Sequence, residues 1–162
     1  MAQQTPVKDG ATRAAEMVEA NAELVEFVGT CSDEEWGRVC TPEGWSVAVV
    51  AHHIAWGHEV AAGWIRTIRE GRDVPGSPAE HDAGNGRKAA EVAGISRGEV
   101  IELANRNIAE LTQLLRSLTE ADFARSAEFG PGGGAEMSVG RLAGARGHLD
   151  RHLNNMREAV GR

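Results

Sequence analysis

Apolar residues recur at intervals of three and four along four stretches of the chain, at about 11–28, 46–70, 96–117 and 138–160. That spacing places the apolar side chains on one face of an α-helix. A serine stands at the start of the last three stretches, where its hydroxyl can cap the first helical turn. No stretch alternates between apolar and polar residues with period two. The pattern therefore predicts an all-α protein, a four-helix bundle with long crossover connections.

The remaining residues are expected to connect these helices within one domain over 11–162. Residues 1–10 show no periodicity, so we expect a loose N-terminal arm. The polar segment 72–85, with two prolines and two glycines, is long for a loop in a bundle and is a candidate functional segment. The glycines at 130–134 are not followed by the lysine of a phosphate-binding loop and predict a flexible turn.

Composition restricts the classes of partner and the compartment. A chain of 162 residues can bury the core of one domain. Its formal net charge of −7, without clustered cations, argues against nucleic acid as a partner. No apolar stretch is long enough for a secretory signal or a membrane span, so we expect a cytoplasmic location and no membrane partner. Cys31 and Cys40 are too few for a disulfide framework and are expected to be free thiols.

Histidines are the main candidates for chemistry. Five of the six lie on two of the predicted helices. His148 and His152 are four residues apart, so on a helix their side chains lie on one face and can chelate one metal ion. Both project from the flank of the apolar stripe, where a cleft would leave the ion open to a further ligand.

A third ligand is expected from another helix, because three protein ligands and one open position are usual at a catalytic ion. His52 points away from the apolar stripe of its helix and is expected to be solvated. His53 and His58 lie on opposite flanks of that stripe, about 140° apart at the α-helical repeat, so one of them can join the pair. The helical wheel leaves the choice between them open.

Two segments resemble the DinB-like superfamily, whose members have a DinB/YfiT-like four-helix bundle. The first runs from Glu43 through Trp45 to Ala55, with the sequence EGWSVAVVAHHIA, and the second is GHLDRHL at 147–153. In that superfamily a histidine eight residues after the tryptophan and the two histidines of an HxxxH pair bind a metal. The resemblance therefore selects His53 and implies His53, His148 and His152 as the ligands.

The resemblance also implies the kind of reaction. Family members hold one divalent ion, with zinc expected first here and nickel or iron as the alternatives. Known activities are thiol S-transfer and isomerisation with a small thiol, mycothiol or a relative of it, and an electrophile. The segment 81–85, with Asp82 and Asn85, resembles one found in relatives of mycothiol-dependent maleylpyruvate isomerase, but no role is assigned to it. The alternative is a non-catalytic DinB-like metal-binding or stress-response protein.

Other residues carry weaker expectations. Trp56 and Trp64 lie away from the centre of the apolar stripe of their helix, and an exposed tryptophan strip would suit a homodimer interface. Arg146 and Arg151 are interpreted as surface charges, and Asp150 is interpreted as solvated.

Overall fold

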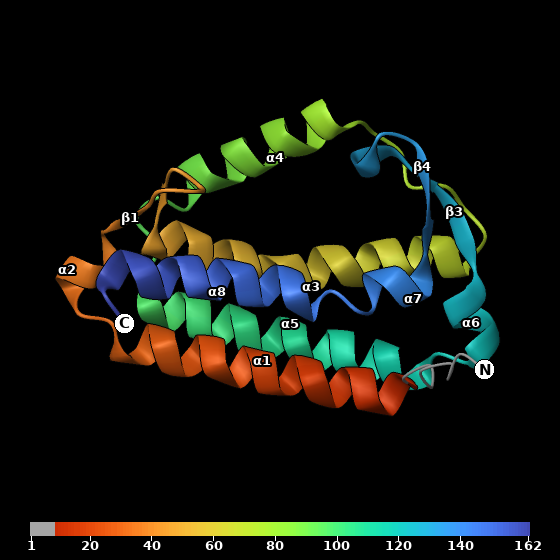
Figure 1. Cartoon of the computed structure of the whole chain (residues 1–162), viewed down its shortest axis with the longest axis horizontal. Helices are drawn as coiled ribbons and strands as arrows, with labels where there is room; N and C mark the ends of the chain where they lie inside the picture. The colour runs from red at the N-terminus through yellow and green to blue at the C-terminus, as the bar shows by residue number, and fades with distance from the viewer. Residues whose placement is uncertain (1–8) are drawn as a thin grey trace, which may run out of the picture.

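The computed structural model describes residues 9–162, and four long helices form its bundle (Figure 1). They are α1 (Gly10–Thr30), α3 (Val47–Arg69), α5 (Arg97–Ser117) and α8 (Arg146–Val160). α5 packs against both α1 and α3, and α8 lies against α3 and α1. The predicted four-helix bundle is confirmed. Residues 1–8 of the predicted arm lie outside the described part, and α1 already begins at Gly10. No helix within 9–162 has the length and apolar character needed to cross a bilayer.

The caps and the apolar stripes explain why these residues form these helices. Ser46 accepts a hydrogen bond from the Val49 amide, and Ser96 forms a capping box with Glu99. The stripes meet in one core, where Leu24, Ile65, Leu115 and Leu153 are among the fully buried side chains. Each such side chain stabilises the fold by about 1.5–3 kcal/mol relative to exposure.

The short helices α2 (Asp33–Trp36) and α6 (Glu120–Ala124) both begin with a capping box. Trp36 at the end of α2 donates a hydrogen bond from its indole nitrogen to the Ile95 carbonyl, 2.9 Å away. Asp122 of α6 pairs with Arg69 of α3 at 3.3 Å. These two turns therefore attach the helix connections to the bundle.

The segment predicted as a polar connection is largely a helix, α4 (Pro78–Glu91). Ser77 caps its first turn by accepting a hydrogen bond from the Glu80 amide. None of its residues is buried, and Gly84 and Gly86 interrupt its sequence, so no apolar stripe marks it as a helix. Figure 1 shows α4 (green) crossing above α3, apart from the rest of the bundle.

Two antiparallel hairpins were also not predicted, because their strands are too short to show an alternating apolar and polar pattern. β1 (Val39–Cys40) pairs with β2 (Trp45–Ser46). β3 (Ser126–Phe129) pairs with β4 (Ala135–Ser138), with Phe129 opposite Ala135. The turn of the second hairpin contains the 3-10 segment η1 (Gly130–Gly132), followed by Gly133 at φ +81° and Gly134 at φ +82°. The predicted glycine turn is thus the bend of a hairpin.

The last predicted helix is divided into α7 (Val139–Leu142) and α8. In a continuous helix the Gly140 carbonyl would accept a hydrogen bond from the Gly144 amide. Here that carbonyl accepts from the Arg13 guanidinium of α1 at 2.8 Å, and the Gly144 amide donates to Arg141 instead. A long-range contact that sequence periodicity cannot reveal therefore accompanies the break.

Candidate metal centre

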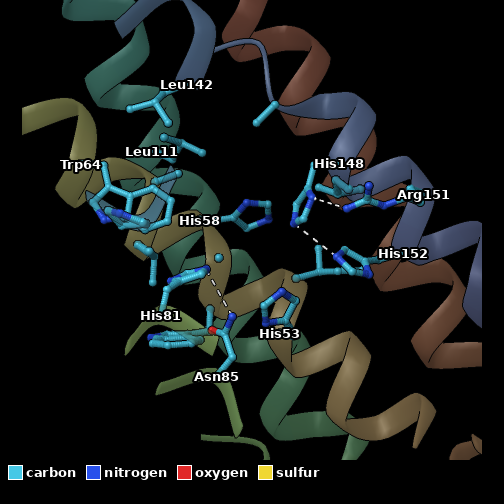
Figure 2. Close-up of a pocket in the computed structure, with 18 of the residues that line it drawn as sticks. His53, His58, Trp64, His81, Asn85, Leu111, Leu142, His148, Arg151 and His152 are labelled. Carbon is cyan, nitrogen blue, oxygen red and sulfur yellow. Dashed lines mark hydrogen bonds between the residues drawn. The ribbon is translucent and has the colours of Figure 1, made fainter. Parts of the chain in front are cut away.

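A cavity of about 530 Å³ lies between α3, α4, α7, α8 and the β3–β4 hairpin. Its lining is mostly apolar and includes Ile54, Trp64, Leu111, Phe129 and Leu142. Figure 2 shows polar side chains entering it from three helices, and the labelled ones are His53, His58, His81, Asn85, His148, Arg151 and His152. The cavity is large enough for a small organic molecule.

Three of these histidines form a cluster at one part of the wall. His53 comes from α3, and His148 and His152 stand one turn apart on α8. One ring nitrogen from each lies within 4.8 Å of the others. The Nε2 atoms of His148 and His152 are 3.2 Å apart. The structure therefore brings together the three residues that the sequence resemblance selected.

A buried carboxylate orients one of these rings. Glu43, between β1 and β2, accepts hydrogen bonds from His152 Nδ1 and Asn155 Nδ2, both at 2.7 Å. Burial opposes its ionisation, but these hydrogen bonds outweigh that effect and the pKa of Glu43 is lowered. The contact places the proton of His152 on Nδ1 and leaves its Nε2 as an acceptor that faces His148 Nε2 in the cluster.

Glu43 lies in the family-like segment 43–55, but no role was predicted for it. Its ring contact lies 109 residues away along the chain, so spacing alone could not find it. A buried carboxylate beside a histidine is a common outer partner of a metal-binding imidazole.

Arg151 contacts the opposite side of the cluster. Its guanidinium donates a hydrogen bond to His148 Nδ1 at 2.9 Å. Because a guanidinium has no acceptor, this contact places the proton of His148 on Nε2. Metal binding through His148 Nε2 requires that proton to leave and Arg151 to turn away. The interpretation of Arg151 as a surface charge was therefore incomplete, since it is exposed but lines the cavity.

Two histidines of the cluster, His53 and His148, have lowered pKa values. Burial, together with the neighbouring His152 and His148, lowers the pKa of His53 to about 4. His148 is an exposed residue, but partial desolvation of its ring at the cavity wall, together with His152 and Arg151, lowers its pKa to about 4. A lowered pKa keeps both imidazoles unprotonated at neutral pH, which is the state that binds a metal.

These residues fit a divalent ion. Two nitrogens on a tetrahedral zinc ion lie about 3.3 Å apart, because Zn–N bonds are about 2.0–2.1 Å long. The separation of 3.2 Å between His148 and His152 matches that requirement. Imidazole ligands suit zinc, nickel, iron and copper. The role of His53, His148 and His152 as ligands stays a prediction, which the closeness of their nitrogens and the Glu43 contact support.

His52 differs from its prediction. It is buried, and its ring stacks on Trp56 with centroids 6.4 Å apart. Burial and the charge of Lys88 lower the pKa of His52. The physical reason is α4, which carries Lys88 and covers a face of α3 that was expected to meet solvent. The three-histidine cluster found among the described residues does not include His52.

The predicted exposed tryptophan strip is also wrong. Trp56 and Trp64 are half-buried and line the cavity. Trp64 packs edge-to-face on Phe129, with ring centroids 4.9 Å apart. The ring centroid of His81 on α4 lies 5.5 Å from that of Trp64. The β3–β4 hairpin and α4 therefore cover the two tryptophan rings, so neither ring is part of an exposed strip. The homodimer loses the observation on which it depended and stays a prediction.

The segment 81–85, without an assigned role in the sequence analysis, is part of the site. His81, Asp82 and Asn85 line the cavity from α4, and the Asn85 amide lies 3.3 Å from His81 Nε2.

On α8, Asp150 and Arg146 pair at 3.4 Å, and Arg146 also binds Glu19 and Glu23 of α1. Arg146 therefore joins two helices at the surface.

The fold and the cluster together define a class: a helical bundle with three histidines gathered on the wall of an apolar cavity. A family model described as the DinB superfamily matches residues 16–156. The chain belongs to the DinB superfamily, as the resemblance indicated.

One solved structure is similar to the chain over almost its whole length. It is YfiT from Bacillus subtilis, described as a probable metal-dependent hydrolase with an unusual four-helix bundle topology. The identity is 18%, the TM-score is 0.75, and the match covers 99% of this chain and 93% of the other. This likeness concerns the fold. Comparison with curated proteins gives no match.

Proposed function

We propose that this protein is a metal-dependent enzyme that transfers a small-molecule thiol to an apolar electrophile, or isomerises a substrate with such a thiol. The observation that supports the proposal is a three-histidine cluster that opens on a mostly apolar cavity of about 530 Å³. An ion held there would keep its full positive charge and favour the deprotonated form of a thiol placed against it.

The chain's own thiols are poor candidates for the nucleophile. Cys31 and Cys40 are both buried, and neither belongs to the cavity lining within the described residues. Burial, together with Glu43, raises the pKa of Cys40 to about 12, so its thiolate is rare at neutral pH. The nucleophile is therefore expected to come from a small molecule, with mycothiol as the first candidate.

The cavity residues would hold the reactants. Trp64 and Phe129 offer aromatic surface for an apolar electrophile. Arg151 supplies a positive charge near the cluster for an anionic group on the thiol or the substrate. Glu43 would keep His152 in the orientation required of a ligand.

A second candidate is hydrolysis, with water in place of the thiol. It is favoured by the description of YfiT as a probable metal-dependent hydrolase. A zinc ion held by the same cluster would supply a water whose pKa is lowered toward about 7. The non-catalytic alternative uses the same ligands without turnover.

Monochlorobimane distinguishes these functions when it is offered together with mycothiol, bacillithiol, glutathione or cysteine. In the reaction the thiol sulfur forms a C–S bond, chloride leaves with the electron pair of the C–Cl bond, and the thiol proton passes to solvent. We expect at least one thiol to react faster with metal-loaded protein than with chelated protein. If none does, and the loaded protein instead cleaves p-nitrophenyl acetate, the hydrolase reading replaces the transferase. If neither reaction occurs, the binding-protein alternative remains.

A further inference from the structure

His58 is a second buried imidazole of the cavity, outside the three-histidine cluster. It comes from α3, lines the cavity and is 3% exposed. Figure 2 shows its ring projecting into the cavity between Trp64 and His148. The helical wheel left His58 as an alternative third ligand, but the cluster contains His53 instead.

A hydrogen bond fixes the tautomer of His58. Its Nε2 lies 3.2 Å from Oδ1 of Asn21, a buried residue of α1. The amide orientation is set in turn by Asn105 of α5, whose Oδ1 lies 3.4 Å from Asn21 Nδ2. An amide oxygen accepts hydrogen bonds and cannot donate them, so the proton of His58 is on Nε2. Its Nδ1 atom therefore has a free lone pair.

That lone pair has no hydrogen-bond partner among residues 9–162. Burial lowers the pKa of His58 to about 4, so the ring is neutral at physiological pH and Nδ1 stays an acceptor. Nδ1 is not among the buried side-chain atoms that lack a partner within 9–162, so it borders the open space of the cavity. A ligand donor placed in the cavity would therefore complete the hydrogen bonding of this ring.

We propose that His58 is a specificity residue, whose Nδ1 accepts a hydrogen bond from an O–H or N–H group of an otherwise apolar ligand in the cavity. Asn21 is the positioning residue that holds the required tautomer. The substrate class is thereby narrowed to apolar or aromatic molecules that carry a hydroxyl or an amide N–H. The inference rests on the proposed function only in taking the cavity as the substrate site.

The test compares 2-naphthol, which has an O–H donor, with 2-methoxynaphthalene, which has nearly the same shape and no donor. Binding of each to the full chain is measured by calorimetry with chelator present, so that metal ligation does not contribute. We expect 2-naphthol to bind about fivefold more tightly, as one net hydrogen bond would give. His58→Phe is expected to abolish this preference, and Asn21→Leu to reduce it.

His52→Phe is the matched control, because His52 is also a buried histidine of α3 but does not line this cavity. It should keep the wild-type preference. Nitrogen-15 NMR of the histidine rings gives an independent readout. His58 should carry its proton on Nε2, and the Nδ1 signal of His58 should shift with 2-naphthol but not with 2-methoxynaphthalene. An unchanged preference in His58→Phe, or a proton on Nδ1, would overturn the proposal. Neither measurement involves metal or thiol, so failure of the proposed transferase would leave these results interpretable.

Discussion

Replacing His53, His148 or His152 by alanine is expected to leave the purified protein without its divalent ion, whereas His52→Ala keeps it. Each of the three supplies one nitrogen to a cluster whose ligand atoms lie within 4.8 Å of one another. A three-ligand site is incomplete when either imidazole of α8 or the imidazole of His53 on α3 is missing. Elemental analysis should give about one ion per chain for the wild type and His52→Ala, and far less for the other three.

His52→Ala is a demanding control, because it also removes a buried imidazole next to the cluster in sequence. Circular dichroism should show that all four variants keep their helices. An empty site in His52→Ala together with a full site in His53→Ala would mean that the assignment along α3 is wrong by one residue.

Gly57→Leu is expected to reduce the thiol reaction at least tenfold without loss of metal. Gly57 lies one turn after His53 on α3 and lines the cavity, and a Cβ added there meets nothing within 4 Å. A leucine side chain can therefore enter the cavity without a clash at its Cβ and occupy space needed by substrate. Leucine also has the higher helix propensity, so the fold should not suffer.

Gly63→Leu provides the matched comparison for this variant. Gly63 is on the same helix, and a Cβ there also meets nothing within 4 Å, but the residue is exposed and does not line the cavity. It should gain the same helix propensity and keep wild-type turnover in the monochlorobimane assay. Equal rates for Gly57→Leu and Gly63→Leu would show that the reaction does not take place in this cavity.

The sequence predicted the parts of the fold that have a strong apolar stripe. The helices α1, α3 and α5 were expected within one or two residues of their observed ends, and α8 was expected as part of a longer helix. α4 has no buried residue and therefore no stripe to detect. Missing α4 had a direct consequence for the site, because His52 and Trp56 were interpreted without the helix that carries Lys88 and Asn85 over them.

The candidate site was predictable to the extent that it depends on local spacing. His148 and His152 are one helical turn apart, and the family-like segment selected His53. Glu43 and Asn21 act through contacts with residues 109 and 37 positions away, which only the fold reveals. His58 was noticed, but its role as a free acceptor depends on which of its nitrogens Asn21 contacts.

The central claim is that the three histidines hold an ion with a coordination position open to a thiol in the cavity. Absorption spectroscopy of cobalt-substituted protein tests it most directly, because cobalt(II) reports its ligands in the visible and near-ultraviolet. Adding the preferred thiol should shift the visible bands and produce an intense sulfur-to-cobalt band, and His53→Ala should show neither change. A cobalt spectrum that saturating thiol leaves unchanged would contradict the claim, because the site would then be closed to the proposed nucleophile.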